Sequence, residues 1–464
     1  MRIFLFLYIF ALPTVLFSQK RDREPSANSN NINNKYQRVS DSIGSNPKQK
    51  LATIDMYRFI NLERDTTYID TSLTIQKEYS HNYLRKDTFG LLAFPNEGQT
   101  YNTLQFGLNA ISPYPEIGFT AKHFNFLEAN QIQYSSVATP VTELYFKSVM
   151  KRGQSVDSFL TLNLSPQLNF SIAYRGLRSE GRYINQLSST GNFRFTTSYN
   201  TKNQRYVANA HFVSQDILNE ENGGITTIED FESKNPSFDT RERLEVYLTD
   251  AKSFLKGKRI FVDHYFRINA LNEVNNWYLT HQFNYENKFF EYNQSTVAST
   301  VGNTRVNRFG DSYVSSGIND QTHYNKMYNI VGLVYENTSL GKFKFFADDF
   351  RSNFYYRQLL ILINQSIPAA LNQNSNSFGG QYEYQKKQWN GKFSYSKSVS
   401  KASFSNLEGK LNYTVNEETQ FSFGYQNLSK IPNANYELYQ SSYVNYNWFN
   451  SFKNEKINTI QYML

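Results

Sequence analysis

The chain has 464 residues, of which 39% are hydrophobic, 16% aromatic and 19% charged, and none is cysteine. Its mean hydropathy is −0.59, and a soluble protein this polar would draw its core mostly from Leu, Ile and Val. Here 35 Tyr and 38 Phe alternate with polar residues instead, which suits a surface with one apolar and one polar face. The lack of cysteine excludes disulfides, a thiolate metal site and a cysteine nucleophile in these residues. The net charge of +8 would suit an anionic partner.

The first residues, MRIFLFLYIFALPTVLFSQKRDRE, have the composition of a secretory signal peptide. Arg2 precedes an apolar run from Ile3 to Phe17, and the small Ser18 comes just before a charged stretch. The run is shorter than the roughly 20 residues of a spanning helix, so a retained N-terminal anchor is the weaker alternative. We therefore expect a signal peptide over residues 1–18 and an exported chain. Export, without a basic helical stripe, argues against a nucleic-acid partner.

The next two stretches lack regular periodicity. Residues 19–50 are rich in Asn and Ser, and we expect a disordered tail. Residues 51–102 hold strand-like and turn-like pieces without sustained alternation, which indicates a periplasmic or plug-like segment. Within it, the stretch NYLRKDTF…GQTYNTL is the part expected to touch a barrel.

From residue 103 to residue 464 the chain repeatedly alternates apolar and polar side chains. Val156–Gly176 does so on both sides of the short turn Ser165–Gln167, and Gly409–Asn427 repeats the pattern around Asn416–Thr419. Strands of this length cross a bilayer when tilted. The pattern predicts an all-β fold, a transmembrane antiparallel up-and-down β-barrel of roughly 18–20 strands. A soluble sandwich, propeller or β-helix is the alternative, but blade signatures and short Gly-rich repeats are not visible.

The connections between the expected strands have two lengths. Some are tight turns, whereas Ser214–Thr240, Asn293–Thr322 and Asn364–Ser377 read as long polar loops. Short turns at one rim and long loops at the other are typical of outer-membrane barrels.

Three stretches carry a family resemblance. They are LERDTTYIDTSLTIQKEYSHNYLRKDTFGLLAFPNEGQTYNTLQFG, ELYFKSVMKRGQSVDSFLTLNLSPQLNFSIAYRGLRSEGRY and TGNFRFTTSYNTKNQRYVANAHFVSQDILNEENGGI. Together they cover about residues 55–230 and resemble the putative porin family of Bacteroidetes outer membranes. The resemblance implies an outer-membrane β-barrel that passes solutes, and it brings no catalytic residue.

The C-terminal end departs from that resemblance. Chains of this family are commonly longer, and barrel proteins tend to finish on an aromatic residue, whereas the last strand, INTIQYML, ends on Leu464. Either this is a variant terminal strand or the barrel is incomplete at the C-terminus. Missing strands would put closure in doubt, because an open sheet edge in lipid is costly.

Strand parity gives the candidate pore lining. If the apolar face meets lipid, the opposite positions face the lumen. These positions are Asn169, Ser171, Arg175, Arg194, Thr196, Asp263, Arg267, Lys410 and Asn412. Arg and Lys outnumber Asp among them, which favours a weak preference for anions. The alternative is that these charges lie near the rims and only solvate the barrel.

No other motif carries a specific chemical prediction. The histidines form no H-x-x-x-H pair, so strand or rim positions are expected rather than metal ligation. Gly310-Asp311-Ser312 lacks the strand–turn–helix setting of a nucleophile elbow, and Asn219–Gly224 lacks the ligand spacing of a calcium loop. We therefore expect no catalytic residue, no metal and no cofactor. An outer-membrane lipid hydrolase is a minor alternative.

The sequence thus predicts a non-enzymatic outer-membrane porin for passive diffusion of small hydrophilic solutes. The competing interpretation is a plugged structural, ligand-binding or adhesive barrel without general pore activity. The expected partners are outer-membrane lipids and lipopolysaccharide, the barrel-insertion machinery, the solutes and, as an option, identical subunits.

Overall fold

The computed structural model describes residues 52–72, 74–104, 110–149, 152–297, 299–301, 304–306, 308–357, 359–362, 366–416 and 419–463. The expected signal peptide and disordered tail, residues 1–50, lie outside the described residues, as does Leu464. In the described part, no helix combines the length and the apolar character that a transmembrane span requires.

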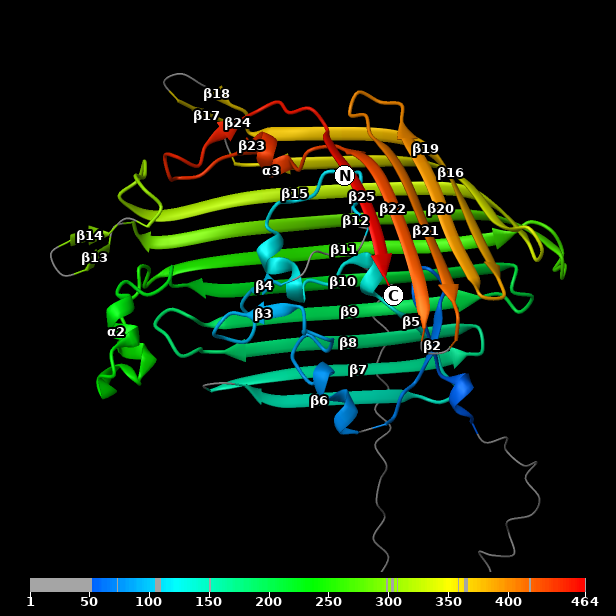
Figure 1. Ribbon diagram of the computed structural model, residues 1–464, viewed down its shortest axis with the longest axis horizontal. Coiled ribbons are helices and arrows are strands. Elements are labelled where there is room, and N and C mark those ends of the chain that lie inside the picture. The colour runs from blue at the N-terminus through cyan, green and yellow to red at the C-terminus, as the bar shows by residue number, and fades with distance from the viewer. Residues whose placement is uncertain are drawn as a thin grey trace, which may run out of the picture. The chain divides into compact units, whose positions relative to one another are not determined.

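Fourteen strands form one antiparallel sheet, in which each strand pairs with the strands that precede and follow it in the sheet order (Figure 1). They are β6 (Val141–Val149), β7 (Gly153–Ser165), β8 (Leu168–Ser179), β9 (Ser188–Asn200), β10 (Tyr206–Glu221), β11 (Ala251–Arg267), β12 (Asn275–Thr296), β15 (Ser316–Asn337), β16 (Gly341–Tyr355), β19 (Ala370–Lys386), β20 (Trp389–Ser398), β21 (Ser405–Thr414), β22 (Gln420–Lys430) and β25 (Glu455–Met463). The predicted all-β, antiparallel up-and-down architecture is confirmed. The sheet is not closed, because β6 and β25 are its two edges.

In the part of the chain that the structure describes, the strands of the sheet are fewer and longer than predicted, fourteen in place of roughly 18–20. β12 and β15 have 22 residues each, about twice the length that crosses a bilayer. Each of the three long loops is therefore shorter than predicted, because strands extend into the predicted loop ranges. β10 continues to Glu221, β12 continues to Thr296, and β19 already begins at Ala370. Beyond the bilayer both faces of a strand meet water, so alternation stops while backbone pairing continues. The strand ends were therefore invisible to a pattern based on alternation.

The remaining elements are short. The described residues between 52 and 137, called the interior segment below, carry β1 (Arg58–Ile60), β2 (Thr66–Tyr68), β3 (Leu91–Ala93), β4 (Tyr101–Thr103) and β5 (Tyr134–Ser136). The long connections of the sheet carry α2 (Ile228–Glu232), β13 (Ser299–Val301), β14 (Thr304–Val306), β17 (Leu360–Ile361), β18 (Ser366–Ile367), α3 (Ala434–Glu437), β23 (Leu438–Tyr439) and β24 (Trp448–Phe449). Figure 1 shows these long connections at one end of the sheet and the tight turns at the other, as predicted.

The two faces of the sheet reverse the usual pattern of burial. On β7 and β8 the apolar Leu164 and Ile172 are 63% and 49% exposed, whereas the polar Thr161 and Ser171 are 0% and 3% exposed. We call the first side the outer face and the second the inner face. An apolar exposed face and a polar covered face are what lipid outside a barrel requires.

The interior segment covers much of the inner face, where blue and cyan ribbons cross the strands in Figure 1. Its contacts, in chain order, join Ile111 to Gln426 of β22, Tyr114 to Asp348 of β16, Pro115 to Tyr324 of β15, Leu127 to Gln215 of β10, Ser135 to Ser171 of β8, and Val137 to Asn163 of β7. The first strand of the sheet begins only at Val141, later than the expected barrel start at residue 103. Residues 110–137 therefore line the inner face instead of forming wall strands.

One glycine of the wall accommodates an aromatic ring of the interior segment. A Cβ at Gly257 of β11 would lie 2.5 Å from the ring of Phe126, and Lys288 of β12 lies 4.4 Å from the same ring. Only a residue without a side chain leaves room for the ring at this position.

We predict that Gly257→Ala weakens docking of the interior segment by about 1–3 kcal/mol, because the added methyl overlaps the Phe126 ring. Thermal unfolding in detergent and the rate of tryptic cleavage after Lys122 measure the effect. Gly409→Ala is the matched control, because its Cβ would lie 3.7 Å from the nearest atom, on Phe393. Equal behaviour of the two variants would contradict the prediction.

Candidate functional site: the inner face and its interior segment

The register places the nine predicted lining residues on the inner face, but in three different environments. Asn169, Ser171, Thr196 and Arg267 are buried, Arg175, Arg194 and Asp263 form ion pairs, Lys410 is exposed and Asn412 is half-buried. The ion pairs and the buried groups other than Arg267 lie beneath the interior segment, whereas Arg267 donates to the carbonyl of Asn203 in the turn after β9. Sequence parity thus gave the face, and the interior segment decided which of these groups meet water.

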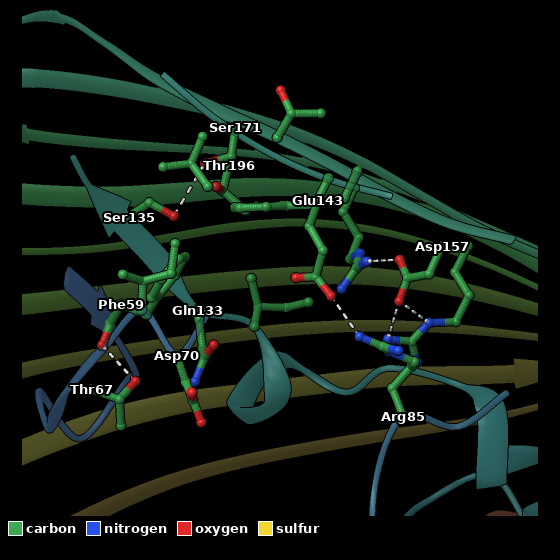
Figure 2. A pocket seen from close by; sticks show the side chains of 18 of the residues that line it. Phe59, Thr67, Asp70, Arg85, Gln133, Ser135, Glu143, Asp157, Ser171 and Thr196 are labelled. Atoms are coloured by element: carbon green, nitrogen blue, oxygen red, sulfur yellow. Dashed lines mark hydrogen bonds and ion pairs between the residues drawn. The ribbon is translucent and has the colours of Figure 1, made fainter. Parts of the chain in front are cut away.

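Under the start of the interior segment lies a cavity of about 630 Å³, called the arginine cavity below (Figure 2). Its polar lining includes Arg85, Glu143, Asp157, Arg175 and Arg194. Asp157 pairs with Arg175 at 2.8 Å and with Arg194 at 3.3 Å. Arg85, from the interior segment, pairs with Glu143 of β6 at 2.5 Å, as Figure 2 shows. The segment and the wall therefore share one cluster of charges.

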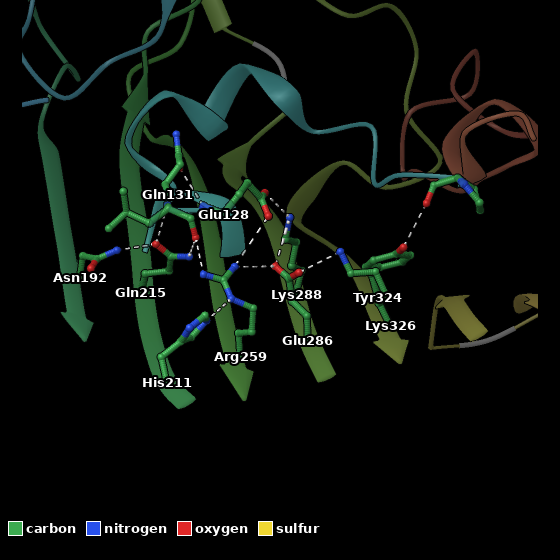
Figure 3. A network of polar contacts seen from close by, with 12 residues as sticks. Glu128, Gln131, Asn192, His211, Gln215, Arg259, Glu286, Lys288, Tyr324 and Lys326 are labelled. Atoms are coloured by element: carbon green, nitrogen blue, oxygen red, sulfur yellow. Dashed lines mark hydrogen bonds and ion pairs between the residues drawn. The ribbon is translucent and has the colours of Figure 1, made fainter. Parts of the chain in front are cut away.

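A buried charge network anchors the middle of the interior segment (Figure 3). Glu286 of β12, whose side chain is 1% exposed, lies 3.1 Å from Lys326, 3.3 Å from Lys288 and 3.9 Å from Arg259. Glu128 of the interior segment reaches Lys288 at 3.0 Å and Arg259 at 3.7 Å. Three cations thus share two carboxylates across the boundary between segment and wall.

Hydrogen bonds extend this network to β10. Arg259 donates from Nε to His211 at 3.0 Å and from Nη2 to the carbonyl of Leu127 at 2.8 Å. The other ring nitrogen of His211 lies 2.8 Å from the hydroxyl of Tyr134. Buried charges are tolerated only when paired and hydrogen-bonded, so this network fixes where the interior segment docks.

A second cavity, of about 470 Å³, lies on the inner face towards the tight turns. Arg64 of the interior segment enters it, 3.2 Å from Asp263 and 4.0 Å from the ring of Tyr265. On the adjoining strands five charged residues are successive cross-strand neighbours. This charged ladder consists of Glu336, Lys342, Glu383, Lys392 and Lys410.

The charged ladder differs from the covered part of the inner face because water reaches it. Glu336, Lys392 and Lys410 are exposed, and Lys342 and Glu383 are half-buried. Glu383 pairs with Lys342 at 3.1 Å and lies 3.9 Å from Lys392. Lys410 stands directly opposite Lys392. The wall is thus polar and open on these strands.

Residues 53–464 match a protein family described as "Putative porin". The chain belongs to the putative porin family. It is therefore a porin-like outer-membrane β-barrel protein, and the family resemblance inferred from the sequence is confirmed. No curated protein matches this porin-family chain.

Solved structures similar to this porin-family chain include two receptors and a channel. The ferric-catecholate import receptor Fiu from E. coli K12 has 6% identity and a TM-score of 0.35, over 76% of this chain and 54% of that chain. BauA, the ferric preacinetobactin receptor from Acinetobacter baumannii, has 9% identity and a TM-score of 0.39, over 72% and 55%. The CymD monoaromatic hydrocarbon channel has 11% identity and a TM-score of 0.25, over 63% and 82%. The porin-family chain spans about half the length of the two receptors.

The sequence analysis of this porin-family chain did not predict the buried charge network, although part of the network could have been predicted. Glu286 and Lys288 alternate with Tyr285 and Phe289 on β12, so the parity rule would have placed both on the inner face. Their burial came from the interior segment, whose sequence has no periodicity to reveal what it covers.

The remaining motifs have ordinary structural roles. His264 and His281 lie on neighbouring strands and share a hydrogen bond between ring nitrogens 2.8 Å apart. In the expected polar loop, Glu221 pairs with Lys122 at 2.6 Å. Ser312 donates to the carbonyl of Ser442. Within the described ranges, no group of three or more His, Asp or Glu residues is arranged to hold a metal ion. Glu417-Glu418 lies outside those ranges.

Glu286→Gln should destabilise the protein by about 3–5 kcal/mol, because Lys326 would lose its ion pair and Arg259 and Lys288 would keep only Glu128. Chemical unfolding in detergent measures the change. Glu245→Gln, at an exposed loop position, is the matched control and should stay within about 0.5 kcal/mol of the wild type. A loss no greater than that of the control would refute the anchoring role.

Acidification should loosen the interior segment through His123. Burial, and secondarily the positive charge of Lys288, lower the pKa of His123 from 6.5 to about 4. The unfolded chain therefore takes up this proton first, so the contribution of His123 is constant above about pH 7 and falls as pH drops from 6.5 to 4, by up to about 3 kcal/mol.

The measurement is the free energy of unfolding across this pH range for the wild type and His123→Phe. The phenyl ring keeps the contact with Phe126, whose centroid lies 5.2 Å from that of His123, and it removes the titration. We expect a shallower pH dependence in the variant. Parallel curves would exclude a part for His123.

Proposed function

We propose that this protein is a porin that lets small hydrophilic solutes diffuse across the outer membrane, along the part of the inner face that the interior segment leaves open. The observation that carries the proposal is the exposure of the charged ladder. Glu336, Lys392 and Lys410 face water on the same side of the sheet on which Asn169 and Ser171 are buried. A barrel with apolar residues outside and hydrated charges inside offers solutes a wet path.

The proposed path involves no chemical step. Solutes would pass between the uncovered wall and Arg64, which the interior segment holds against Asp263 and Tyr265. The width of the gap between Arg64 and the uncovered wall would limit the size of the solutes, and the charged ladder would select among them by charge. Membrane lipid surrounds such a protein, and lipopolysaccharide, the insertion machinery and a second copy of the chain remain proposed partners.

The proposed weak anion preference has a different origin from the one expected from the sequence. Arg175 and Arg194 are paired with Asp157 beneath the interior segment, so they do not line the open part of the wall. Lys392 and Lys410 face one another, with Glu383 beside Lys392 only. The summed field of these two lysines would favour anions in the open part of the lumen.

In planar bilayers under a salt gradient we expect a reversal potential that favours anions. The double variant Lys392→Glu/Lys410→Glu should move it towards cations, because it inverts the excess charge of the open wall. The control, Lys202→Glu/Lys234→Glu, makes the same change in charge at two exposed lysines outside the sheet strands and should leave the potential unchanged. Identical shifts in both double variants would reject the ladder as the selective element.

A second candidate is a plugged barrel that binds ligands without general conductance. It is favoured by the extent of the interior segment, which bonds to strands from β22 to β7. The same bilayers separate the two candidates. A correctly inserted, protease-resistant protein that carries no current would favour the plugged barrel and overturn the diffusion pore.

A further inference from the structure

We propose that the arginine cavity is a binding site for small organic carboxylates, with the carboxylate held by Arg85 and Arg194 and the apolar part against Phe59 and Phe159. The inference deepens the proposed function by naming a solute class, and it rests on that function because a solute must enter the lumen to reach the cavity. It does not depend on the charged ladder, which lies on other strands.

Around the cavity, cations outnumber carboxylates once the lysine that pairs with Asp70 from outside is counted. Three arginines line it, Arg85, Arg175 and Arg194, against the carboxylates of Glu143, Asp157 and Asp70. Asp70 is compensated from outside the cavity, because Lys77 pairs with it and lowers the pKa of its carboxyl far below the usual range.

A further lysine adds to this excess. Lys86 follows Arg85 in the chain, and burial and the charge of Arg175 lower the pKa of its ammonium. In the cavity itself, three guanidinium groups share Glu143 and Asp157. A bound anion would relieve this imbalance.

The hydrogen bonds show which guanidinium group has a donor without an acceptor. Arg175 donates two hydrogen bonds to Oδ2 of Asp157, from Nε at 2.9 Å and from Nη2 at 2.8 Å. Arg194 has one long contact to the same carboxylate, 3.3 Å from its Nη2, and its Nε is buried without a hydrogen-bond partner. A buried donor left without an acceptor costs about 1–3 kcal/mol. A second carboxylate would satisfy it in the paired geometry that arginine prefers.

Arg85 is the complementary group on the interior segment. It holds Glu143 through Nη2 at 2.5 Å and lies 4.1 Å above the ring of Tyr145. The wall therefore supplies Arg194 and the segment supplies Arg85, so an anion between them would link the two.

The apolar part of the cavity distinguishes an organic anion from an inorganic one. Phe59 of β1 and Phe159 of β7 approach with ring centroids 6.0 Å apart, and both line the cavity, as does Ile132. Ser171 and Thr196 add hydroxyl groups on the wall side (Figure 2). Aromatic surfaces on one side and guanidinium groups on the other fit a carboxylate on a small ring or short chain.

Calorimetric titration of the full chain in detergent with benzoate tests the site, with benzamide as the uncharged probe of the same shape and inorganic phosphate as the probe without an apolar part. We expect benzoate to bind, and benzamide and phosphate to bind at least about tenfold more weakly, equal to about 1.4 kcal/mol. Benzamide binding as tightly as benzoate, or no binding of benzoate, would overturn the proposal.

Two variants move the affinity in opposite directions. Arg194→Gln should weaken benzoate binding about tenfold or more, whereas Asp157→Asn removes the competing carboxylate and should strengthen it about tenfold. A gain in affinity cannot result from misfolding. Asp157→Asn therefore tests the binding site even if Arg194→Gln does not fold. Arg351→Gln, with a side chain 60% exposed on β16, is the matched control. Unchanged affinity in Asp157→Asn would refute the site.

The two proposals fail separately. A protein that conducts in bilayers but does not bind benzoate keeps the porin and loses the carboxylate site. A protein that binds benzoate with the expected response to Asp157→Asn but carries no current keeps the site and loses the diffusion pore.

Discussion

The polar inner face of the sheet is the constraint on which the rest of the structure depends. A sheet that turns its apolar residues outward, such as Leu164 and Ile172, must turn hydroxyl, amide and charged groups inward. Those groups need water or protein partners, because an unsatisfied buried polar group costs free energy. Over much of the sheet the partner is the interior segment, which bonds to β22 at Ile111 and to β7 at Val137.

The same constraint explains why charge concentrates at the boundary between segment and wall. Glu286 could not be buried alone, so Lys288, Lys326 and Arg259 neutralise it, and Glu128 offsets part of their remaining positive charge. The arginine cavity has the same ratio of three cations to two carboxylates, but its charged groups line an open cavity of about 630 Å³, and that difference separates an anchoring network from a candidate binding site. Where the segment ends, the charged ladder has water as its partner, and that part of the wall is the candidate path for solutes.

The fold could be predicted from the sequence wherever a local period exists. Alternation on Leu160–Ser165 and Leu168–Arg175 follows from the pleat of a strand, which every strand of a barrel obeys. It failed at strand ends, as at Glu221 and Thr296, where both faces are polar and only backbone pairing continues. It also failed for residues 110–137, whose contacts are single long-range hydrogen bonds that leave no periodic trace.

The sequence by itself thus determined the antiparallel up-and-down order of strands and the apolar and polar faces, because these follow from the alternation of side chains with a period of two residues. It also determined the family, because short stretches of sequence are specific to it. Only the tertiary structure decided which inner residues are buried, paired or open. Arg194 and Lys410 are equivalent by parity, yet one is tied to Asp157 under the segment and the other faces water. Their difference arises from what lies across the lumen, a contact between distant parts of the chain that no local pattern encodes.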